Sequence, residues 1–325
     1  MASPAIGTTV PDSELRCGQV ADVALPKLER VLLCSDFAAA SESATVEAID
    51  LCKRTGASLC VLHVDEYGDC SRGLGSELFY LAQRQQSLEQ NMKSVVERAR
   101  NERIAVDALT VSGHPPVTIV EMIASYRPDL AIMGTNGIRG FERMIFGSTA
   151  EAVFRHASCP VLIAGPKASS KRQRGCGPVV FATDFHEPAR DAARYALALA
   201  QVKGVPLHCL HVLPLIAEND RQHTILNSIM SEALRRLTKD LDSNSCRVSE
   251  EVVFDSEISH AVVSYAEKKN AEGIVLGVNR GTLLSSHRPP HLTYRMIATA
   301  PCPVLTISRE AISTARNIPI AVYDS

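Results

Sequence analysis

Short apolar runs alternate with longer amphipathic stretches along most of the chain. In the first half, near-continuous Val, Ile and Leu runs predict strands at 30–34, 58–64, 104–111, 129–133 and 160–164. Apolar positions with helical spacing predict helices at about 41–54, 76–101, 116–126 and 147–156. Strands that lack in–out alternation are typical of parallel sheets covered by helices on both faces. The pattern therefore predicts a doubly wound α/β domain with right-handed βαβ crossovers.

The same pattern occurs a second time. Residues 30–64 (RVLLCSDFAAASESATVEAIDLCKRTGASLCVLHV) and 178–212 (PVVFATDFHEPARDAARYALALAQVKGVPLHCLHV) share Asp-Phe after the first apolar run and Leu-His-Val at the end. Asp36 in the first copy corresponds to Asp184 in the second, an offset of 148. A repeat of this length predicts two tandem domains rather than a solenoid.

The ends of the copies set the expected domain bounds. SCPVLIA in the first copy matches PCPVLTI in the second, and Cys159 corresponds to Cys302 at an offset of 143. Between the copies, GPKASSKRQRGCGP (165–178) has the Gly, Pro and basic composition of an exposed linker. We expect a tail at 1–27, a domain at 28–165, a linker at 166–177, a domain at 178–309 and a tail at 310–325.

Composition narrows the class of protein. The 325 residues are 46% hydrophobic, contain no Trp and carry a formal net charge of −2. A near-neutral chain gives no electrostatic case for nucleic acid or an acidic membrane as a partner. The ten cysteines lack a dense framework or a C-x-x-C pair, so free thiols in a reducing compartment are expected. The apolar runs are too short to cross a bilayer, and we expect a cytoplasmic protein.

A glycine-rich stretch, GTNGIRGFERMIFGSTAE (134–151), carries the candidate chemistry. It follows the fourth predicted strand, while Asp36 follows the first, and ligands of open parallel sheets collect where the strand order reverses. Glycines admit a ligand close to the backbone, and Gly147-Ser148-Thr149 would offer N–H groups and hydroxyls to an anion at a helix start. Arg139 and Arg143 could reach the same anion. Equally, the stretch could be a surface turn with an N-cap, and Asp36 a local turn residue.

Several of these residues resemble the universal stress protein family. The resemblance lies in Asp36-Phe37, in Leu62-His63-Val64 and in Cys159-Pro160-Val161-Leu162. The spacing Gly134-x2-Gly137-x9-Gly147-Ser148 also fits that family's ATP signature, Gly-x2-Gly-x9-Gly-(Ser/Thr). The resemblance covers roughly residues 28–164 and 178–308, nearly everything except the tails and the linker.

The resemblance implies a fold and a ligand. Each domain would be a five-stranded parallel sheet with strand order 3-2-1-4-5 and helices on both faces. ATP, with or without Mg²⁺, would bind in the first domain: Asp36 at the ribose hydroxyls or the nearby adenosine edge, the Val64 backbone at the adenine, and the glycines and hydroxyls at the phosphates. No catalytic residue and no protein ligand to a metal is expected. The expected site residues are Ser35, Asp36, Phe37, Val64, Met133, Gly134, Gly137, Arg139, Gly147, Ser148 and Thr149.

The second copy departs from the signature. At the offset of 143, Gly277 retains the first glycine, but Arg280, Pro290 and His291 stand where the pattern needs Gly, Gly and Ser. Proline has no N–H to donate and its ring occupies space that a phosphate needs. We therefore expect one working nucleotide site per chain, in the first domain.

Function is then a choice among three classes. The favoured one is a nucleotide-responsive stress or signalling protein with an unidentified protein partner, rather than a catalyst. A slow ATP hydrolase and a scaffold without nucleotide remain as alternatives, and AMP or a cyclic or dinucleotide relative could replace ATP. Family members pair through the last strand of each domain, so the copies are expected to form a pseudo-dimer within the chain, with association of two chains left open.

Other recurring residues are interpreted as structural. His63 and His211 are expected to be hydrogen-bonded core histidines, because each lies in a predicted buried strand. Cys159 and Cys302 are expected to be unreactive. The segment 66–78 is either a lid over the nucleotide or a plain surface loop.

Overall fold

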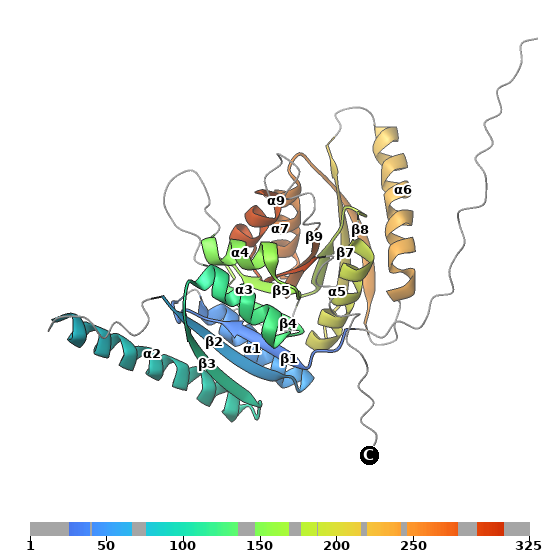
Figure 1. Ribbon diagram of the computed structural model, residues 1–325. Helices are drawn as coiled ribbons and strands as arrows, with labels where there is room; N and C mark the ends of the chain where they lie inside the picture. Colours follow the sequence, from blue (N-terminus) through green and yellow to red (C-terminus); the bar gives the residue numbers. More distant parts are fainter. Residues whose placement is uncertain are drawn as a thin grey trace, which may run out of the picture.

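The structure is a computed structural model that describes residues 26–39, 41–66, 76–135, 147–168, 177–186, 188–215, 220–241, 246–278 and 291–308. Strands and helices alternate in both copies (Figure 1). The first copy contains β1 (Arg30–Cys34), α1 (Ser41–Thr55), β2 (Ser58–Asp65), α2 (Ser76–Asn101), β3 (Val106–Ser112), α3 (Pro115–Tyr126), β4 (Leu130–Gly134), α4 (Ser148–His156) and β5 (Val161–Ala164). The second contains β6 (Val179–Ala182), α5 (Ala189–Lys203), β7 (Leu207–Pro214), α6 (Asp220–Thr238), η1 (Lys239–Leu241), β8 (Val248–Asp255), α7 (Ile258–Lys268), β9 (Gly273–Val278), α9 (His291–Thr299) and β10 (Val304–Ser308).

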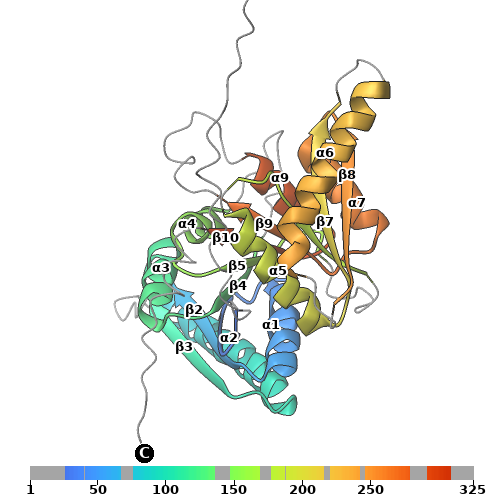
Figure 2. The ribbon, with the colours of Figure 1, turned by 90° about the vertical axis from the view of Figure 1, so that its right-hand side faces the viewer.

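All ten strands belong to one sheet, in the order β3-β2-β1-β4-β5-β10-β9-β6-β7-β8 (Figure 2). Within each copy every strand pair is parallel, and the order in the first copy is 3-2-1-4-5. The second copy repeats this order from β8 to β10. The predicted α/β fold class is confirmed, and the strands and helices predicted for the first copy begin and end within two residues of the observed bounds.

The two copies join through their last strands. β5 and β10 pair antiparallel, with Leu162 opposite Leu305 and Val161 opposite Thr306. The Thr306 hydroxyl also donates a hydrogen bond of 3.1 Å to the carbonyl of Val161. An edge strand with free backbone groups is satisfied by another edge strand, so the predicted pseudo-dimer within the chain is confirmed.

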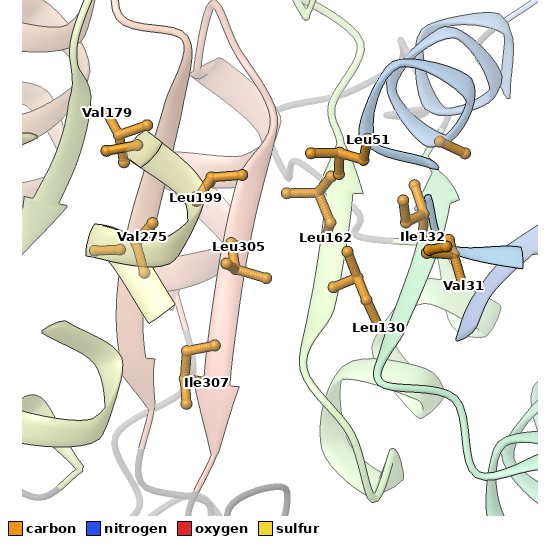
Figure 3. Close-up of a cluster of buried hydrophobic side chains, with 14 of the residues drawn as sticks. Val31, Leu51, Leu130, Ile132, Leu162, Val179, Leu199, Val275, Leu305 and Ile307 are labelled. Atoms are coloured by element: carbon orange, nitrogen blue, oxygen red, sulfur yellow. The ribbon is translucent and has the colours of Figure 1, made fainter. Parts of the chain in front are cut away.

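One hydrophobic core lies on each face of the sheet, and each core runs through both copies. α1, α2, α5 and α6 cover one face, while α3, α4, α7 and α9 cover the other. Figure 3 shows part of the first core, where side chains of both copies meet across β5 and β10. Because each core is continuous, separating the copies would expose apolar surface on both faces.

The edge strand β3 differs from the prediction of a strand covered on both faces. Five of its seven residues are exposed, including Leu109 at 37% exposure. At the opposite edge, every residue of β8 is half-buried, because α6 and α7 both pack against that strand. The apolar run therefore predicted a strand correctly but not its burial, which depends on helices far away in the sequence.

Two further properties concern the residues that the structure describes. Among them, no helix is both long enough and apolar enough to cross a bilayer. Seven of their cysteines are buried and form no disulfide bond: Cys34, Cys52, Cys60, Cys159, Cys209, Cys246 and Cys302.

Candidate functional site

The reversal of strand order lies at the carboxyl ends of β1 and β4. β1 runs between β2 and β4, and Cys34 at the end of β1 is in register with Met133 near the end of β4. Ser35 and Asp36 therefore leave the sheet beside Gly134. This is the crevice in which open α/β sheets bind their ligands, so two segments that are a hundred residues apart in the chain meet where the sequence predicts.

Asp36 forms a tight turn at the end of β1. Its Oδ1 accepts hydrogen bonds from the backbone N–H of Ala38 (2.9 Å) and from the hydroxyl of Ser41 (2.6 Å). Phe37 adopts a left-handed conformation with φ of 57°, which a non-glycine residue takes up at a cost. Asp36 therefore does stabilise the local turn. Its side chain is nevertheless exposed, and Oδ2 accepts no hydrogen bond from the described residues, so that oxygen can receive a ligand hydroxyl.

His63 holds this turn against the sheet. Its Nδ1 lies 2.9 Å from the carbonyl oxygen of Ser35, so Nδ1 carries the proton, and its ring stacks on Phe37 with centroids 5.2 Å apart. His63 is buried, and its Nε2 has no hydrogen-bond partner among the described residues. The prediction of a core histidine is confirmed, but it is bonded on one nitrogen only.

The N-terminus of α4 closes the other side of the crevice. Gly147 is the N-cap, with no side-chain cap, and the first helical hydrogen bond runs from the N–H of Glu151 to the Gly147 carbonyl (2.9 Å). The N–H groups of Ser148 and Thr149 therefore come before Glu151, the first helical donor, so they have no acceptor within the helix and are available to an anion. In the described part of the chain, this is the most direct match to the predicted phosphate contact.

Thr135 was missed by the sequence reasoning, although it directly follows Gly134. It is 5% exposed, and its backbone N–H donates to the carbonyl of Ala164 (3.0 Å). Its Oγ1 would lie 3.9 Å from a Cβ at Gly147, so the end of β4 and the start of α4 are in contact. A threonine inside a glycine motif is the only sequence signal for this position.

The remaining predicted residues divide into three groups. Val64 is half-buried in β2 and is paired with Val111, so its backbone lies at the same edge as Asp36. Met133 is buried in the core below this edge. Gly137 and Arg139 lie outside the described residues, as do Arg143 and most of the segment 66–78. Within the described ranges no group of three or more His, Cys, Asp or Glu side chains is placed to hold a metal ion.

The sequence and this geometry can be compared with known proteins. The pattern of the "Universal stress protein family" matches residues 27–165 and 176–308, which is well over half of the chain. The chain belongs to the universal stress protein family. Both copies are members, since each of the two matched ranges contains one complete five-stranded unit.

Individual relatives agree with this assignment. A universal stress protein of Methanocaldococcus jannaschii is 28% identical over 142 residues, which cover 42% of this chain and 81% of the relative. The crystal structure of a universal stress protein from Archaeoglobus fulgidus is 19% identical, with a TM-score of 0.62 over 88% of this chain and 98% of its own. A protein of unknown function from Pseudomonas aeruginosa gives a TM-score of 0.59 at 17% identity, over 89% and 96%. These structures share the two-copy fold.

The second universal stress domain keeps the first turn of the site. His186 N–H donates to Asp184 Oδ1 (3.0 Å), and Phe185 has φ of 64°. His211 Nδ1 lies 2.7 Å from the carbonyl oxygen of Thr183, as His63 does from that of Ser35. The β1 turn of the site is therefore a structural feature of the fold and cannot by itself distinguish a ligand site.

The glycine half of the site differs between the domains. A Cβ at Gly277 would lie 3.4 Å from the Ala192 Cβ and 3.5 Å from the Pro188 Cδ, so the start of α5 packs closely against this glycine. Gly277 is thus used for packing in the second domain. Arg280 and Pro290 lie outside the described residues, and His291 is the first residue of α9.

A Ser–His–Asp cluster in the second domain was also missed. His260 Nδ1 lies 3.3 Å from Asp255 Oδ2, and His260 Nε2 lies 3.3 Å from Ser264 Oγ, the connectivity of a hydrolytic triad. Ser264 and His260 are one turn apart within α7, however, where backbone N–H groups are used by the helix and cannot stabilise an oxyanion. The cluster is best explained by Asp255, whose Oδ1 accepts the N–H of Glu257 at the start of α7 (2.9 Å).

A cavity of about 500 Å³ lies between the end of α6 and the start of β8. Its wall is charged, with Glu232, Arg235, Arg236 and Glu250 among the lining residues. Glu232 pairs with both arginines, at 3.5 Å and 3.1 Å. The cavity is at the amino end of β8, not at the carboxyl ends of the strands where open α/β sheets bind their ligands, and its charges largely compensate one another.

Proposed function

We propose that this universal stress protein binds ATP in its first domain and works as a nucleotide-responsive binding protein. The observation that carries the proposal is the uncapped N-terminus of α4, which starts against Thr135 at the end of β4, the strand paired with the β1 strand that leads to Asp36. A helix N-terminus attracts phosphate through its free N–H groups and its partial positive charge. The exposed carboxylate of Asp36 supplies an acceptor for ribose hydroxyls at the other side of the same crevice.

The spacing of the glycine signature favours ATP as the nucleotide. Gly134 ends β4 and Gly147 caps α4, and the family's ATP signature has glycines at both positions. A Cβ at Gly147 would find only Thr135 Oγ1, at 3.9 Å, so among the described residues nothing in the protein requires glycine there. The absence of a side chain is then explained by a ligand that approaches the backbone.

Adenine nucleotides are known ligands within the family. Two solved structures of universal stress proteins are complexes with cAMP and with dAMP, the latter from Archaeoglobus fulgidus. They match 42% and 40% of this chain with TM-scores of 0.34 and 0.32, so they do not show which ligand this chain binds. The proposal of ATP depends on the first-domain site itself.

Binding rather than catalysis fits the groups at the crevice. A general base must reach the proton that it removes. His63 uses Nδ1 on the Ser35 carbonyl and buries Nε2, and Asp36 uses one oxygen in its own turn. We therefore propose that the nucleotide stabilises the conformation that holds it best, and that a protein partner responds to this state. Turnover would be limited to slow attack by water.

Isothermal titration of Mg-ATP into the full-length protein tests the proposal. The wild type is expected to bind about one nucleotide per chain, and the double variant Gly147→Pro, Ser148→His, which copies the second domain, is expected not to bind. A matched pair gives a finer test, because Asp36 and Asp184 have the same turn geometry. Asp36→Asn should weaken ATP about tenfold through loss of a charged hydrogen bond, while Asp184→Asn should leave the affinity unchanged.

Each outcome decides between the alternatives. Two sites per chain, or equal effects of the two Asn variants, would refute the single-site proposal. No binding by folded, nucleotide-free wild type would favour the scaffold alternative. Phosphate release from bound ATP at a steady rate of turnover, abolished in the Gly147→Pro, Ser148→His variant, would favour an enzyme.

A further inference from the structure

The first turn of α4 carries a negative charge close to the proposed phosphate contact. Glu151 is three residues after Ser148, which is about 4.5 Å along the axis at 1.5 Å per residue. A carboxylate there stabilises an empty helix N-terminus, but it repels a phosphate that binds at the same end. A site for a polyphosphate therefore needs this charge to be compensated.

Arg155 compensates it from the next turn. Both its Nε and its Nη2 lie 2.9 Å from Glu151 Oε1. The arginine side chain is 25% exposed and the glutamate 38%, so the pair is partly withdrawn from water and keeps more of its interaction than a fully exposed pair. The helix thus presents a neutral first turn below its free N–H groups.

The second domain supplies a third member of this group. The Phe154 and Tyr294 rings meet edge to face with centroids 5.4 Å apart, which places Tyr294 of α9 against α4. The Tyr294 hydroxyl is buried, and Glu151 and Arg155 are near enough to influence its ionisation. The pKa of Tyr294 is raised to about 12, mainly by burial and in part by Glu151, with Arg155 acting in the opposite direction. The phenol therefore remains protonated and can donate to the carboxylate.

Glu151 and Tyr294 occupy equivalent positions in the two copies, at the offset of 143 that relates Cys159 to Cys302. They therefore approach each other across the pseudo-twofold axis between the domains. Two first domains paired in the same way would place two Glu151 carboxylates together, and like charges at this distance repel. The second copy instead places a neutral donor there.

We propose that Arg155 and Tyr294 set the charge at the N-terminus of α4, so that the second domain, which has lost its own signature, completes the nucleotide site of the first. Arg155 is a positioning residue that neutralises Glu151, and Tyr294 holds that pair from the other domain. The site consequently favours ligands with several phosphates over adenosine. This inference rests on the proposed function and adds how the site selects its ligand.

The test compares ligands that differ in charge. Adenosine, AMP, ADP and ATP are titrated into the full-length wild type and into Arg155→Met, Glu151→Gln, the double variant and Tyr294→Phe. Arg155→Met should weaken ATP about three- to tenfold, the size of a charge effect at a helix end, and leave adenosine unchanged. Glu151→Gln in the same chain should restore ATP binding. Tyr294→Phe keeps the ring and should weaken ATP about two- to threefold, again without changing adenosine.

The outcomes separate this inference from the function on which it rests. Wild type that binds none of the four ligands refutes the proposed function and the inference with it. Wild type that binds ATP, combined with losses in Arg155→Met or Tyr294→Phe that are equal for adenosine and ATP, refutes the inference alone. Thermal unfolding checks that each variant is folded. Should Arg155→Met not fold, Glu151→Gln alone decides, because removing the negative charge must raise affinity for ATP relative to adenosine.

Discussion

Lys203 on α5 and Glu47 on α1 form an ion pair between the two domains, with Nζ 2.5 Å from Oε1 and both side chains only 4% exposed. Asp50 lies 4.0 Å from the same ammonium group, and Arg54 donates to the Lys203 carbonyl at 3.4 Å. The residues equivalent to Glu47 and Lys203 at the offset of 148 are Tyr195 and Thr55. The repeat therefore does not generate a second pair, and this interaction belongs to the contact of a first domain with a second.

Removing one partner of this pair should destabilise the protein strongly. Lys203→Met removes the ammonium group that faces the buried Glu47 carboxylate, and Glu47→Gln leaves the buried Lys203 ammonium with the more distant Asp50; breaking a buried pair in this way typically costs about 3–5 kcal/mol. The double variant Glu47→Gln, Lys203→Met removes both charges and should recover much of the loss. Urea unfolding at pH 7 of the four proteins gives the free energies and their coupling.

An exposed pair on the first domain provides the control. Lys53 and Glu102 are 2.7 Å apart, with side chains 57% and 42% exposed. Lys53→Met should change the free energy of unfolding by less than about 1 kcal/mol. Additive effects in the Glu47 and Lys203 cycle would contradict a direct interaction between the two buried groups.

Alanine substitutions at two glycines should distinguish an effect on protein stability from an effect on ATP binding. A Cβ at Gly165 would lie 1.9 Å from the carbonyl oxygen of Ile297 in α9, so Gly165→Ala must push the domains apart and should cost at least about 1–3 kcal/mol. A Cβ at Gly147 meets only Thr135 Oγ1, at 3.9 Å, so Gly147→Ala should leave the melting temperature within a few degrees of the wild type, an effect of about 0.5 kcal/mol or less.

The same Gly147→Ala variant should nevertheless bind ATP more weakly, because a methyl group would stand where the phosphate approaches the backbone. Differential scanning calorimetry and ATP titration of both glycine variants check this pair of expectations. Full ATP affinity in a stable Gly147→Ala protein would show that no ligand atom comes close to this position.

Tyr195 should make the protein sensitive to alkali. Burial raises the pKa of its phenol to about 12, and the carboxylates of Asp129 and Asp191 contribute. Because the unfolded phenol has a pKa of about 10, the unfolded state loses its proton first as the pH rises. The stabilisation is complete below pH 10 and is lost between about pH 10 and 12. Urea unfolding of wild type and Tyr195→Phe at pH 8, 10 and 11 should show a shallower decline in the variant, and parallel curves would refute this assignment.

The helices and strands could be predicted from the sequence because each is determined by residues that are close together in the chain. Apolar runs of four to eight residues in 30–34 or 58–64 can hardly be anything but strands in a βαβ repeat. The turn at Asp36 was recognisable for the same reason, since its hydrogen-bond partners Ala38 and Ser41 are neighbours in the chain.

The pairing of the last strands was predicted, but the side-chain contacts across the pseudo-twofold axis could not be predicted from the sequence. Nothing adjacent to Lys203 or Glu47 distinguishes them from surface charges on amphipathic helices, and their burial depends on how α1 and α5 pack. The same holds for Glu151 and Tyr294, whose positions are equivalent but whose side chains have opposite chemical roles. The role of Thr135 is similarly hidden, because it depends on the contact of β4 with α4.

The buried cysteines give the last prediction. Burial raises the pKa of Cys52 to about 12 and that of Cys60 to about 11, and it raises the pKa of Cys34 and Cys209 still further. Thiolates are the reactive form, so these residues should resist alkylation even at pH 9. The chain has ten cysteines and seven are buried in the described residues, which leaves three. Iodoacetamide followed by mass spectrometry should therefore label at most three thiols in the native protein and all ten in urea. Fast labelling of Cys159 or Cys302 in the native protein would contradict a structural role for that thiol and would reopen redox sensing.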